Sequence, residues 1–209
     1  MTELEKMQKG MIYDPCEPTL KKQRSRAHIL CQKYNNIKET NSKKRTKVIN
    51  QLLPNKDSGL YLQGPIYFDY GINTFFGKNF YANFNFTVLD CALVSIGDNV
   101  FVGPNVSIMT PMHPYLPTER NLYINKYGIE TDKEYAKSIK IGNNCWIASD
   151  VVICGGVTIG DGCVIGAGSV VTRDIPSGVL AAGNPCRVIR KITEEDSIYL
   201  KKELFEGEE

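Results

Sequence analysis

The chain has 209 residues and a formal net charge of +2, enough for one domain with an appendage and too little positive charge to favour a nucleic-acid partner. It contains no apolar run that would cross a membrane, and its charged first residues lack the apolar core of a secretory signal. We therefore predict a cytoplasmic protein with no membrane partner.

Residues 1–55 do not share the periodicity of the rest of the chain and predict an N-terminal helical appendage. The pattern indicates a short helix over residues 2–10, an amphipathic helix with a basic face over 20–35, and a third helix over 42–53 that ends before Pro54. A basic helix face is usually solvated surface, so it gives no reason to expect a phosphate ligand there.

Residues 56–191 are rich in strand-forming residues, and their second half repeats every six residues. A period of six fits neither a helix nor simple strand alternation and is typical of a hexapeptide solenoid. One hexapeptide supplies one short strand and one corner, with an aliphatic side chain inside and a small residue at the bend, and three make one coil of a three-sided prism. The aliphatic positions of the repeat are Ile96, Val102, Ile108, Ile141, Ile147, Ile153, Ile159, Ile165 and Val171.

The first coils are expected to be wider and less regular than the later ones. An aromatic-rich section has imperfect repeats at Ile66 and Ile72, and then at Phe76, Ala82 and Val88. The repeat then stops at residues 111–138, a polar segment with several prolines, which a solenoid can accommodate only as a loop that projects from a corner.

After the repeat ends near Pro176, residues 180–192 read as a closing strand, and residues 193–205 predict a short helix that covers the last coil, within a C-terminal segment of residues 192–209. The predicted fold is therefore mainly β: a parallel β-helix with a helical appendage, a projecting loop and a short C-terminal helix. The periodicity does not give the hand of the coil.

The seven cysteines are an odd number with no Cys-x-x-Cys motif. Cys145 and Cys163 fall at corner or inward positions of the repeat. We expect these thiols to be reduced and to pack as small hydrophobic residues.

Several short sequence motifs together resemble those of a known protein family. Tyr81-Ala-Asn-Phe and His113-Pro are the most specific, and the others are Ile141-Gly-Asn-Asn, Gly156-Val-Thr-Ile-Gly-Asp, Ile165-Gly-Ala-Gly-Ser and Ala182-Gly-Asn-Pro-Cys-Arg. With these motifs the chain resembles the maltose and galactoside O-acetyltransferases, hexapeptide-repeat enzymes that use acetyl-CoA. The resemblance covers nearly the whole chain, including the appendage. It implies a left-handed coil and a homotrimer whose active sites lie between subunits.

Acyl transfer from a thioester to a hydroxyl needs a base, a donor for the developing oxyanion and a groove for the cofactor. His113 is the only strong base candidate, because the ordinary pKa of imidazole lies close to neutrality, whereas His28 falls in the basic helix and is better explained as a surface residue. The resemblance implies direct attack without an acyl-enzyme, with His113 as the general base and the backbone N–H of Ser149 holding the thioester oxygen.

The resemblance also assigns the remaining site residues. The galactoside branch has a serine at the position of Asp69 and a second carboxylate where this chain has Cys91, so a maltose- or glucose-type acceptor is expected. Acceptor contacts fall on Asp14, Asp69, Tyr81, Asn83, Asp90 and Glu134, whose carboxylates suit sugar hydroxyls.

The cofactor groove should run between two neighbouring prisms. Trp146 would pack against the pantetheine arm or against a neighbouring subunit. Ser149, Ala167, Thr172 and Arg173 would follow one edge, and Arg187 and Arg190 would bind the phosphates of coenzyme A. No metal is expected to take part in catalysis.

Hexapeptide solenoids also serve other functions. A γ-type carbonic anhydrase needs three histidines on zinc, and this chain has two. An ice-binding solenoid needs a flat array of repeated threonines, which is absent from the repeat. An acetyltransferase for another acceptor class, such as serine, an amino sugar nucleotide or an antibiotic, stays open, because it would share both fold and cofactor.

Overall fold

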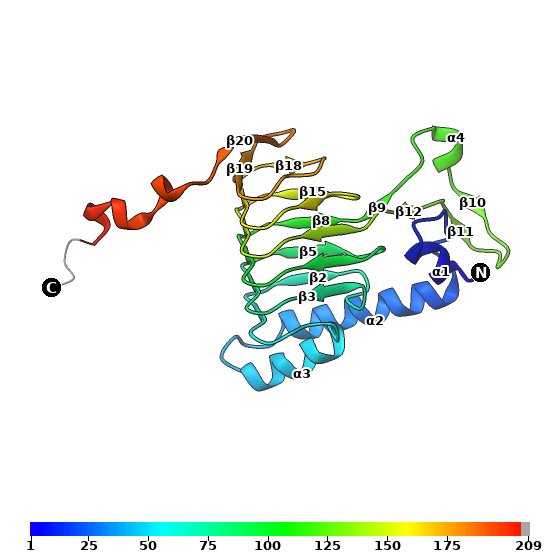
Figure 1. The fold of residues 1–209 in the computed structure, drawn as a ribbon. Helices are drawn as coiled ribbons and strands as arrows, with labels where there is room; N and C mark the ends of the chain where they lie inside the picture. The colour runs from blue at the N-terminus through cyan, green and yellow to red at the C-terminus, as the bar shows by residue number, and fades with distance from the viewer. Residues whose placement is uncertain (206–209) are drawn as a thin grey trace.

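The computed structural model describes residues 1–205. They form a helical layer, a three-sided β-helix with a projecting arm, and a C-terminal extension (Figure 1). The end of the predicted C-terminal segment, residues 206–209, lies outside the described residues.

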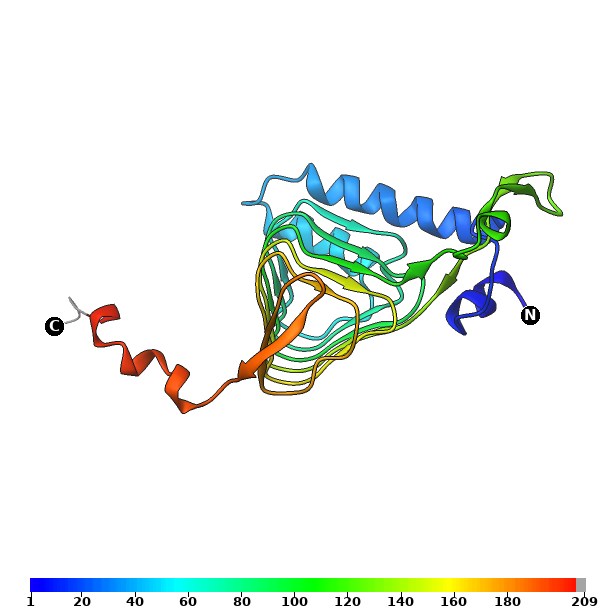
Figure 2. The ribbon, with the colours of Figure 1, turned by 90° about the horizontal axis from the view of Figure 1, so that it is seen from above.

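The appendage contains the three predicted helices, α1 (Glu3–Gln8), α2 (Pro18–Asn35) and α3 (Ser42–Leu52). Thr2 and Glu5 form a capping box on α1, and Asn41 caps α3. The α2 helix lies along one flank of the β-helix, and α3 lies below its first coils (Figures 1 and 2). Leu52 and Leu53 are fully buried in the main core, so the appendage closes the open end of the prism.

Three sheets form the sides of the prism. Sheet 1 contains β1 (Tyr61–Leu62), β4 (Tyr81–Ala82), β7 (Phe101–Val102), β14 (Trp146–Ile147), β17 (Val164–Ile165), β19 (Val179–Ala182) and β20 (Arg187–Lys191). Sheet 2 contains β2 (Ile66–Phe68), β5 (Phe86–Leu89), β8 (Ser107–Met109), β15 (Val152–Cys154) and β18 (Val170–Val171). Sheet 3 contains β3 (Thr74–Phe76), β6 (Val94–Ile96), β13 (Ile139–Ile141) and β16 (Thr158–Ile159).

The chain passes from sheet 1 to sheet 2 to sheet 3 in every coil, and Figure 2 shows the resulting triangle along the prism axis. All strand pairs within these sheets are parallel except β19 with β20. The predicted left-handed parallel β-helix is confirmed. Its repeat positions stack in register, as in Val102 beside Ile147 and Ile147 beside Ile165, and all three side chains are buried in the axial core.

Asparagine ladders hold one row of corners together. Asn79, Asn99 and Asn144 adopt φ values of 56°, 54° and 56°, a left-handed conformation that asparagine tolerates better than most residues. Their side-chain amides bond from coil to coil at 3.0 and 3.1 Å. The tight bend and the stacking of identical residues therefore stabilise each other.

The predicted phase of the first coils is wrong at Ile72. The inward side chains of sheets 2 and 3 are Phe68 and Phe76, eight residues apart, as are Val88 and Ile96 in the next coil. Two extra residues therefore lie in each of these two coils between sheets 2 and 3, and they shift the six-residue phase. Ile72 falls within such an insertion and is only partly buried, outside the axial core.

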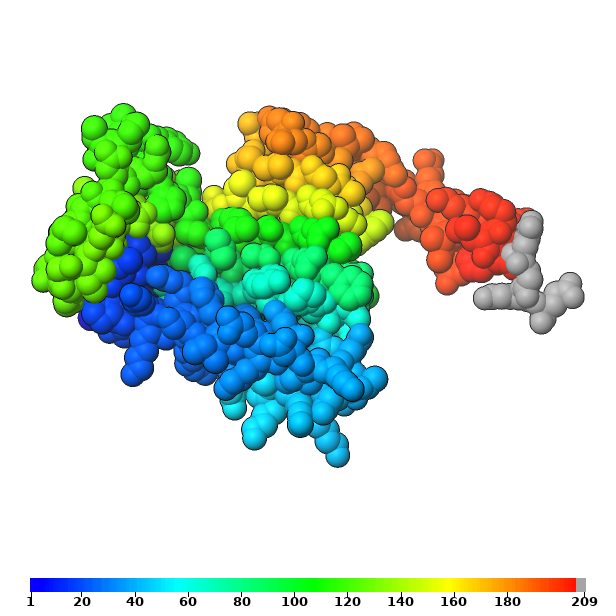
Figure 3. All heavy atoms as spheres, turned by 180° about the vertical axis from the view of Figure 1, so that it is seen from behind, coloured from blue at the N-terminus to red at the C-terminus, as the bar shows by residue number. Residues whose placement is uncertain are grey.

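The projecting loop leaves the prism at this same place, between Ile108 of sheet 2 and Ile141 of sheet 3. We call this edge, between sheets 2 and 3, the arm corner. The base of the arm is an antiparallel ribbon of β9 (Pro111–Met112) and β12 (Tyr135–Ala136), and its outer part contains α4 (Pro117–Arg120), β10 (Tyr123–Ile124) and β11 (Glu130–Thr131). In Figure 3 the arm lies beside the N-terminal helices.

The C-terminal prediction needs correction. The closing strand is a hairpin of β19 and β20. In place of one helix over the last coil, residues 194–196, 198–200 and 202–204 form three short 3-10 turns, and this segment leads away from the prism (Figures 1 and 2). Its apolar side chains, including Ile198 and Leu200, are exposed, so it finds no core to pack on within the described chain.

Among the described residues, no helix has the length and apolar character needed to cross a membrane. The division of the chain at residues 55 and 191 stays a prediction.

Candidate active site

His113 follows β9 at the base of the arm and faces two carboxylates. Because Met112 pairs with Tyr135 across the ribbon, the next residues outward, His113 and Glu134, lie opposite each other. The Nδ1 atom of His113 is 2.9 Å from Asp132 Oδ2, and its Nε2 atom is 3.9 Å from Glu134 Oε1. The backbone ribbon thus holds one imidazole between two acidic groups.

Glu134 is anchored by the N-terminal segment. Tyr13 forms a β-bridge with Glu134 and donates its hydroxyl to Glu134 Oε2. Burial raises the pKa of Glu134, although the hydrogen bond from Tyr13 lowers it. The other carboxylate oxygen of Glu134 faces His113, so a sugar bound here could donate one hydroxyl to His113 and a neighbouring hydroxyl to Glu134.

Asp14 fastens the arm to the appendage. Its Oδ1 accepts hydrogen bonds from Thr131 Oγ1 at 2.7 Å and from Cys16 N at 2.9 Å, and its Oδ2 accepts one from Asn125 Nδ2 at 2.7 Å. Both oxygens of Asp14 therefore already have donors, and in this arrangement the residue frames the site by holding the arm down.

Asp69 and Asp90 occupy the arm corner one coil apart. Asp69 follows β2; its Oδ1 lies 3.2 Å from His28 Nε2, and its Oδ2 accepts from Cys91 Sγ at 3.6 Å. Asp90 is completely buried and accepts hydrogen bonds from backbone and side-chain groups of residues 70–74. Asp69 is partly exposed and paired with His28, whereas Asp90 is buried and shapes the corner beneath it.

A second group of predicted residues lies elsewhere, on sheet 1 and the edge that it shares with sheet 2. Tyr81 and Trp146 stand on the outer face of sheet 1 in register with Phe101, and Trp146 is 55% exposed. Asn83 follows β4, and its Oδ1 accepts from Phe84 N at 2.7 Å.

The backbone amide of Ser149 is free for a ligand. Its neighbours Ala148 and Asp150 donate to Ile165 O and Pro104 O at 2.9 Å each. Within residues 1–205, no hydrogen bond of the Ser149 N–H to protein is formed. A backbone N–H without a protein acceptor is what an oxyanion requires.

The predicted cofactor residues do not all share one edge. Ala167 lies one coil above Ser149 on the same edge, where Gly168 N donates to Ser149 O at 2.9 Å. Thr172 and Arg173 instead follow β18 and lie at the arm corner, so the expectation that they line the same edge is wrong. The reason is the six-residue step, which moves the chain from one corner to the next between Ala167 and Thr172.

Arg187 and Arg190 lie on β20, whose residues are all exposed. Arg190 forms a bidentate pair with Asp196 at 2.7 and 2.6 Å, and this guanidinium lowers the pKa of Asp196 to about 2. Arg187 donates to Cys186 O at 2.8 Å. Arg190 would have to leave Asp196 in order to bind a phosphate.

One chain does not bring the two groups together. His113, Glu134 and Asp69 occupy the arm corner, and Tyr81 and Ser149 occupy sheet 1 and its edge with sheet 2, so the width of sheet 2 separates them. Within one chain, the His113 side chain and the Ser149 amide therefore lie at different corners of the prism.

Asp132 is the functional residue that sequence reasoning missed. It lies two residues before Glu134 in extended chain, where side chains i and i+2 share a face. Two carboxylates at alternate positions of a polar loop are the sequence feature from which a role for Asp132 could have been predicted. His113, Asp132 and Glu134 are near enough for a metal ion, but the two carboxylates face opposite ring nitrogens. The 2.9 Å contact between His113 Nδ1 and Asp132 Oδ2 is a hydrogen-bonding distance, which favours a hydrogen-bonded base.

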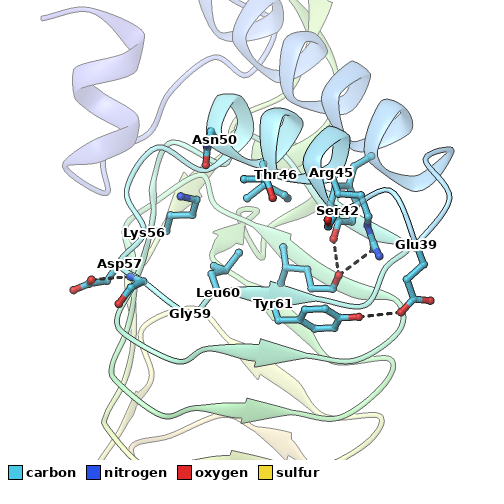
Figure 4. A pocket seen from close by; sticks show the side chains of 14 residues that line it. Glu39, Ser42, Arg45, Thr46, Asn50, Lys56, Asp57, Gly59, Leu60 and Tyr61 are labelled. Atoms are coloured by element: carbon cyan, nitrogen blue, oxygen red, sulfur yellow. Dashed lines mark hydrogen bonds between the residues drawn. The ribbon is translucent and has the colours of Figure 1, made fainter.

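The thiols give no sign of a nucleophile. Cys145 and Cys163 are buried, as predicted, and burial raises the pKa of Cys145 to about 11. A separate pocket of about 260 Å³ lies between α3 and the first coil (Figure 4), and none of the predicted site residues lines it. Two of its charged groups already have partners: Glu39 accepts from the hydroxyl of Tyr61 at 2.9 Å, and Arg45 donates to Leu62 O at 3.1 Å.

Comparisons with known proteins agree with the fold. Residues 138–173 match the bacterial transferase hexapeptide model, residues 6–56 the maltose acetyltransferase hexapeptide capping motif, and residues 93–111 the hexapeptide repeat of succinyl-transferase. The galactoside O-acetyltransferase of Escherichia coli is 42% identical over 200 residues, which are 95% of this chain and 94% of that protein.

Two solved structures are similar along nearly the whole chain. A galactoside acetyltransferase in complex with coenzyme A is 41% identical, with a TM-score of 0.86 and 94% of each chain covered. A maltose O-acetyltransferase from Clostridium difficile is 43% identical, with a TM-score of 0.82, 93% of this chain covered and 99% of that one.

The fold and these relatives define an acyltransferase of the hexapeptide-repeat class. Within that class, the chain belongs to the family of galactoside and maltose O-acetyltransferases.

Proposed function

We propose that this protein transfers the acetyl group of acetyl-CoA to a hydroxyl of a glucose- or maltose-type sugar. The observation that carries the proposal is His113 between Asp132 and Glu134, with the Nε2 atom turned toward Glu134 and the space beside it. The family relationship supports the cofactor, since one similar structure is a complex with coenzyme A. Asp69 and Cys91 at the arm corner favour the maltose-type branch over the galactoside-type branch.

In the proposed reaction, the acceptor hydroxyl donates to His113 Nε2, and a neighbouring hydroxyl donates to Glu134. Asp132 accepts the Nδ1 proton of His113, so Nε2 carries the lone pair that takes the hydroxyl proton. The alkoxide attacks the thioester carbon and the C–S bond breaks. The intermediate oxyanion is held by the Ser149 amide of the other chain. Coenzyme A leaves as the thiolate, which takes up the proton that His113 received.

The active enzyme is proposed to be a homotrimer with sites between subunits. The outer face of sheet 1 presents Tyr61, Tyr81, Phe101 and Trp146 in register. Tyr61 stacks on Tyr81 at 5.8 Å, and Tyr81 lies 6.2 Å from Phe101. Soluble monomers rarely expose an aromatic stripe of this kind. A second chain against this face would cover the stripe and complete the site, with Trp146 in contact with either the cofactor or that chain.

The reaction is tested by measuring release of the coenzyme A thiol from acetyl-CoA with glucose, maltose, a galactoside, serine and chloramphenicol as acceptors. Release that depends on glucose or maltose is expected. Release only with serine or chloramphenicol would move the protein to another acceptor class. If acetyl-CoA bound without release to any acceptor, the sugar acetyltransferase would be ruled out.

Replacing Asp132 by Asn should lower kcat by about tenfold and leave the KM for acetyl-CoA nearly unchanged, because the amide no longer fixes the Nδ1–H tautomer of His113. The measurement is a steady-state pH profile of kcat for both proteins. Glu130→Gln is the matched control, since Glu130 is an exposed carboxylate of the same arm. Equal effects of the two substitutions would exclude a positioning role for Asp132.

Replacing Phe101 by Lys should weaken the assembly, because the substitution places a charge in the middle of the aromatic stripe. Sedimentation velocity should give a trimer for the wild type and a dominant monomer for the variant at micromolar concentration, with activity per chain falling in parallel. A monomeric wild type with full activity would overturn the shared site.

A further inference from the structure

A groove of about 280 Å³ runs between α2 and sheet 2 and ends at Asp69. The α2 helix supplies His28, Gln32 and Asn35 to its wall, β2 supplies Tyr67, and Asp69 follows directly after β2. In the proposed reaction, the acetyl group is transferred to an acceptor hydroxyl that is bound at His113. Of the residues that line the groove, this reaction uses only Asp69. The proposed reaction therefore does not explain why polar and aromatic side chains line this groove.

The groove combines hydrogen-bonding groups with an aromatic surface. His28 Nε2 and Asp69 Oδ1 lie 3.2 Å apart, with 51% and 17% of their side chains exposed, so both groups can reach a ligand. Tyr67 is 48% exposed, although it lies beside buried Phe68. A pyranose has hydroxyl groups around its edge and an apolar face. The carboxylate and the imidazole can hydrogen-bond the hydroxyls, and the aromatic ring can pack against the apolar face.

The groove reaches the same corner of the prism as the acetylation site, because Asp69 lines it. The Oδ2 atom of Asp69 is 3.6 Å from Cys91 Sγ. Cys91 packs in the same buried cluster as Tyr13, and Tyr13 donates to Glu134, which faces His113. Buried Cys91 and Tyr13 thus pack between Asp69 and Glu134, and they hold the groove and the base at the same corner.

The charge of the groove limits its occupant. Its one carboxylate, Asp69, lies at the end toward the reaction site, and the imidazole of His28 is already paired with it. A phosphate at this position would lie against that carboxylate, which disfavours an acceptor carrying a nucleotide. A neutral polyhydroxylated ring meets no such repulsion.

We infer that this groove is a second acceptor subsite, which binds the sugar ring adjacent to the one that is acetylated. This inference rests on the proposed function and narrows it to acceptors of two or more sugar rings. Tyr67 supports the apolar face of the second ring, and His28 and Gln32 bond its hydroxyls. Recognition of one extra ring in such a subsite is expected to raise kcat/KM by about tenfold.

The test compares kcat/KM for maltose with that for glucose, in the assembled enzyme. In the wild type we expect maltose to be favoured by about tenfold, and Tyr67→Ala should lower this ratio to about one through a higher KM for maltose. Phe75→Ala is the matched control. Phe75 is the middle residue of a three-residue strand with the same alternating burial as β2, and its ring is 44% exposed outside the groove. The ratio should stay at its wild-type value in this control.

His28→Ala provides a second variant in case Tyr67→Ala does not fold, because it truncates a half-exposed helix residue. It should also lower the maltose to glucose ratio. A wild-type enzyme that acetylates glucose and maltose equally, or variants that keep the wild-type ratio, would overturn the subsite and leave the proposed reaction intact. A wild type that acetylates neither sugar would overturn the proposed function, and the subsite with it.

Discussion

Replacing His113 by Ala should reduce the acceptor-dependent release of coenzyme A by at least about a hundredfold, and by up to about ten-thousandfold. The imidazole places one ring nitrogen near Asp132 and the other near Glu134, so its loss removes both the base and the link to Asp132. In free energy the expected change is about 3 to 5 kcal/mol of transition-state stabilisation. The measurement is kcat/KM with the best sugar acceptor at saturating acetyl-CoA.

The control for this substitution separates chemistry from structure. Tyr115→Ala changes a neighbouring arm residue whose ring is 83% exposed, and it should retain nearly full activity. Both variants should bind coenzyme A and sediment like the wild type. If His113→Ala kept a tenth or more of the wild-type rate, another group would have to be the base, and the assignment of Glu134 as its partner would fall too.

Much of the fold could be predicted because periodicity reports directly on packing. A buried aliphatic residue at every sixth position has one simple explanation, which is a prism with strands on its sides. The prediction was wrong at Ile72, where the chain inserts two residues at the arm corner. An insertion within an aromatic-rich segment keeps the segment hydrophobic, so the change of phase cannot be detected from hydrophobicity alone.

The C-terminal segment shows another limit of the same reasoning. Residues 193–205 have enough apolar and charged residues to suggest an amphipathic helix. An amphipathic pattern predicts that one face of a helix will be buried, but it does not show which part of the protein will bury it. Ile198 and Leu200 stay exposed within the described chain. The local structure there is accordingly three short turns, since an isolated helix of this length is marginal in water.

The candidate site could be predicted in its residues and only partly in its geometry. His113 and Glu134 are distant in sequence, and their approach depends on the antiparallel ribbon that joins Met112 to Tyr135. The division of the site between two edges of the prism follows from counting hexapeptide steps, which places Thr172 and Arg173 on the arm corner and Ala167 with Ser149. The cofactor residues therefore fit a cleft between two chains better than a groove on one.

Replacing Asp90 by Ala should lower the free energy of unfolding by about 4 kcal/mol. Asp90 is 0% exposed, and burial raises its pKa to about 6, so it is mainly ionised at pH 7. Its carboxylate accepts from the backbone amides of Tyr70 at 2.8 Å, Gly71 at 3.1 Å and Asn73 at 3.2 Å, and from Thr74 Oγ1 at 3.0 Å. Alanine leaves these four donors buried without acceptors.

The measurement is urea unfolding of both proteins at the same chain concentration, because assembly adds to the apparent stability. Asp161→Ala is the matched control. Asp161 also accepts a backbone amide, from Asn143 at 2.6 Å, but at an exposed corner, where water can replace it, so the expected cost is below about 1 kcal/mol. Similar losses for the two variants would contradict the structural role given to Asp90.

The same substitution links stability to the acceptor site. The donors that Asp90 holds belong to residues 70–74, the inserted segment that directly follows Asp69. If Asp90 fixes this segment, Asp90→Ala should raise the KM for the sugar acceptor more than the KM for acetyl-CoA, even at temperatures where the protein remains folded. A variant that lost stability with both KM values unchanged would mean that Asp69 is positioned by β2 and His28 alone, without the buried carboxylate.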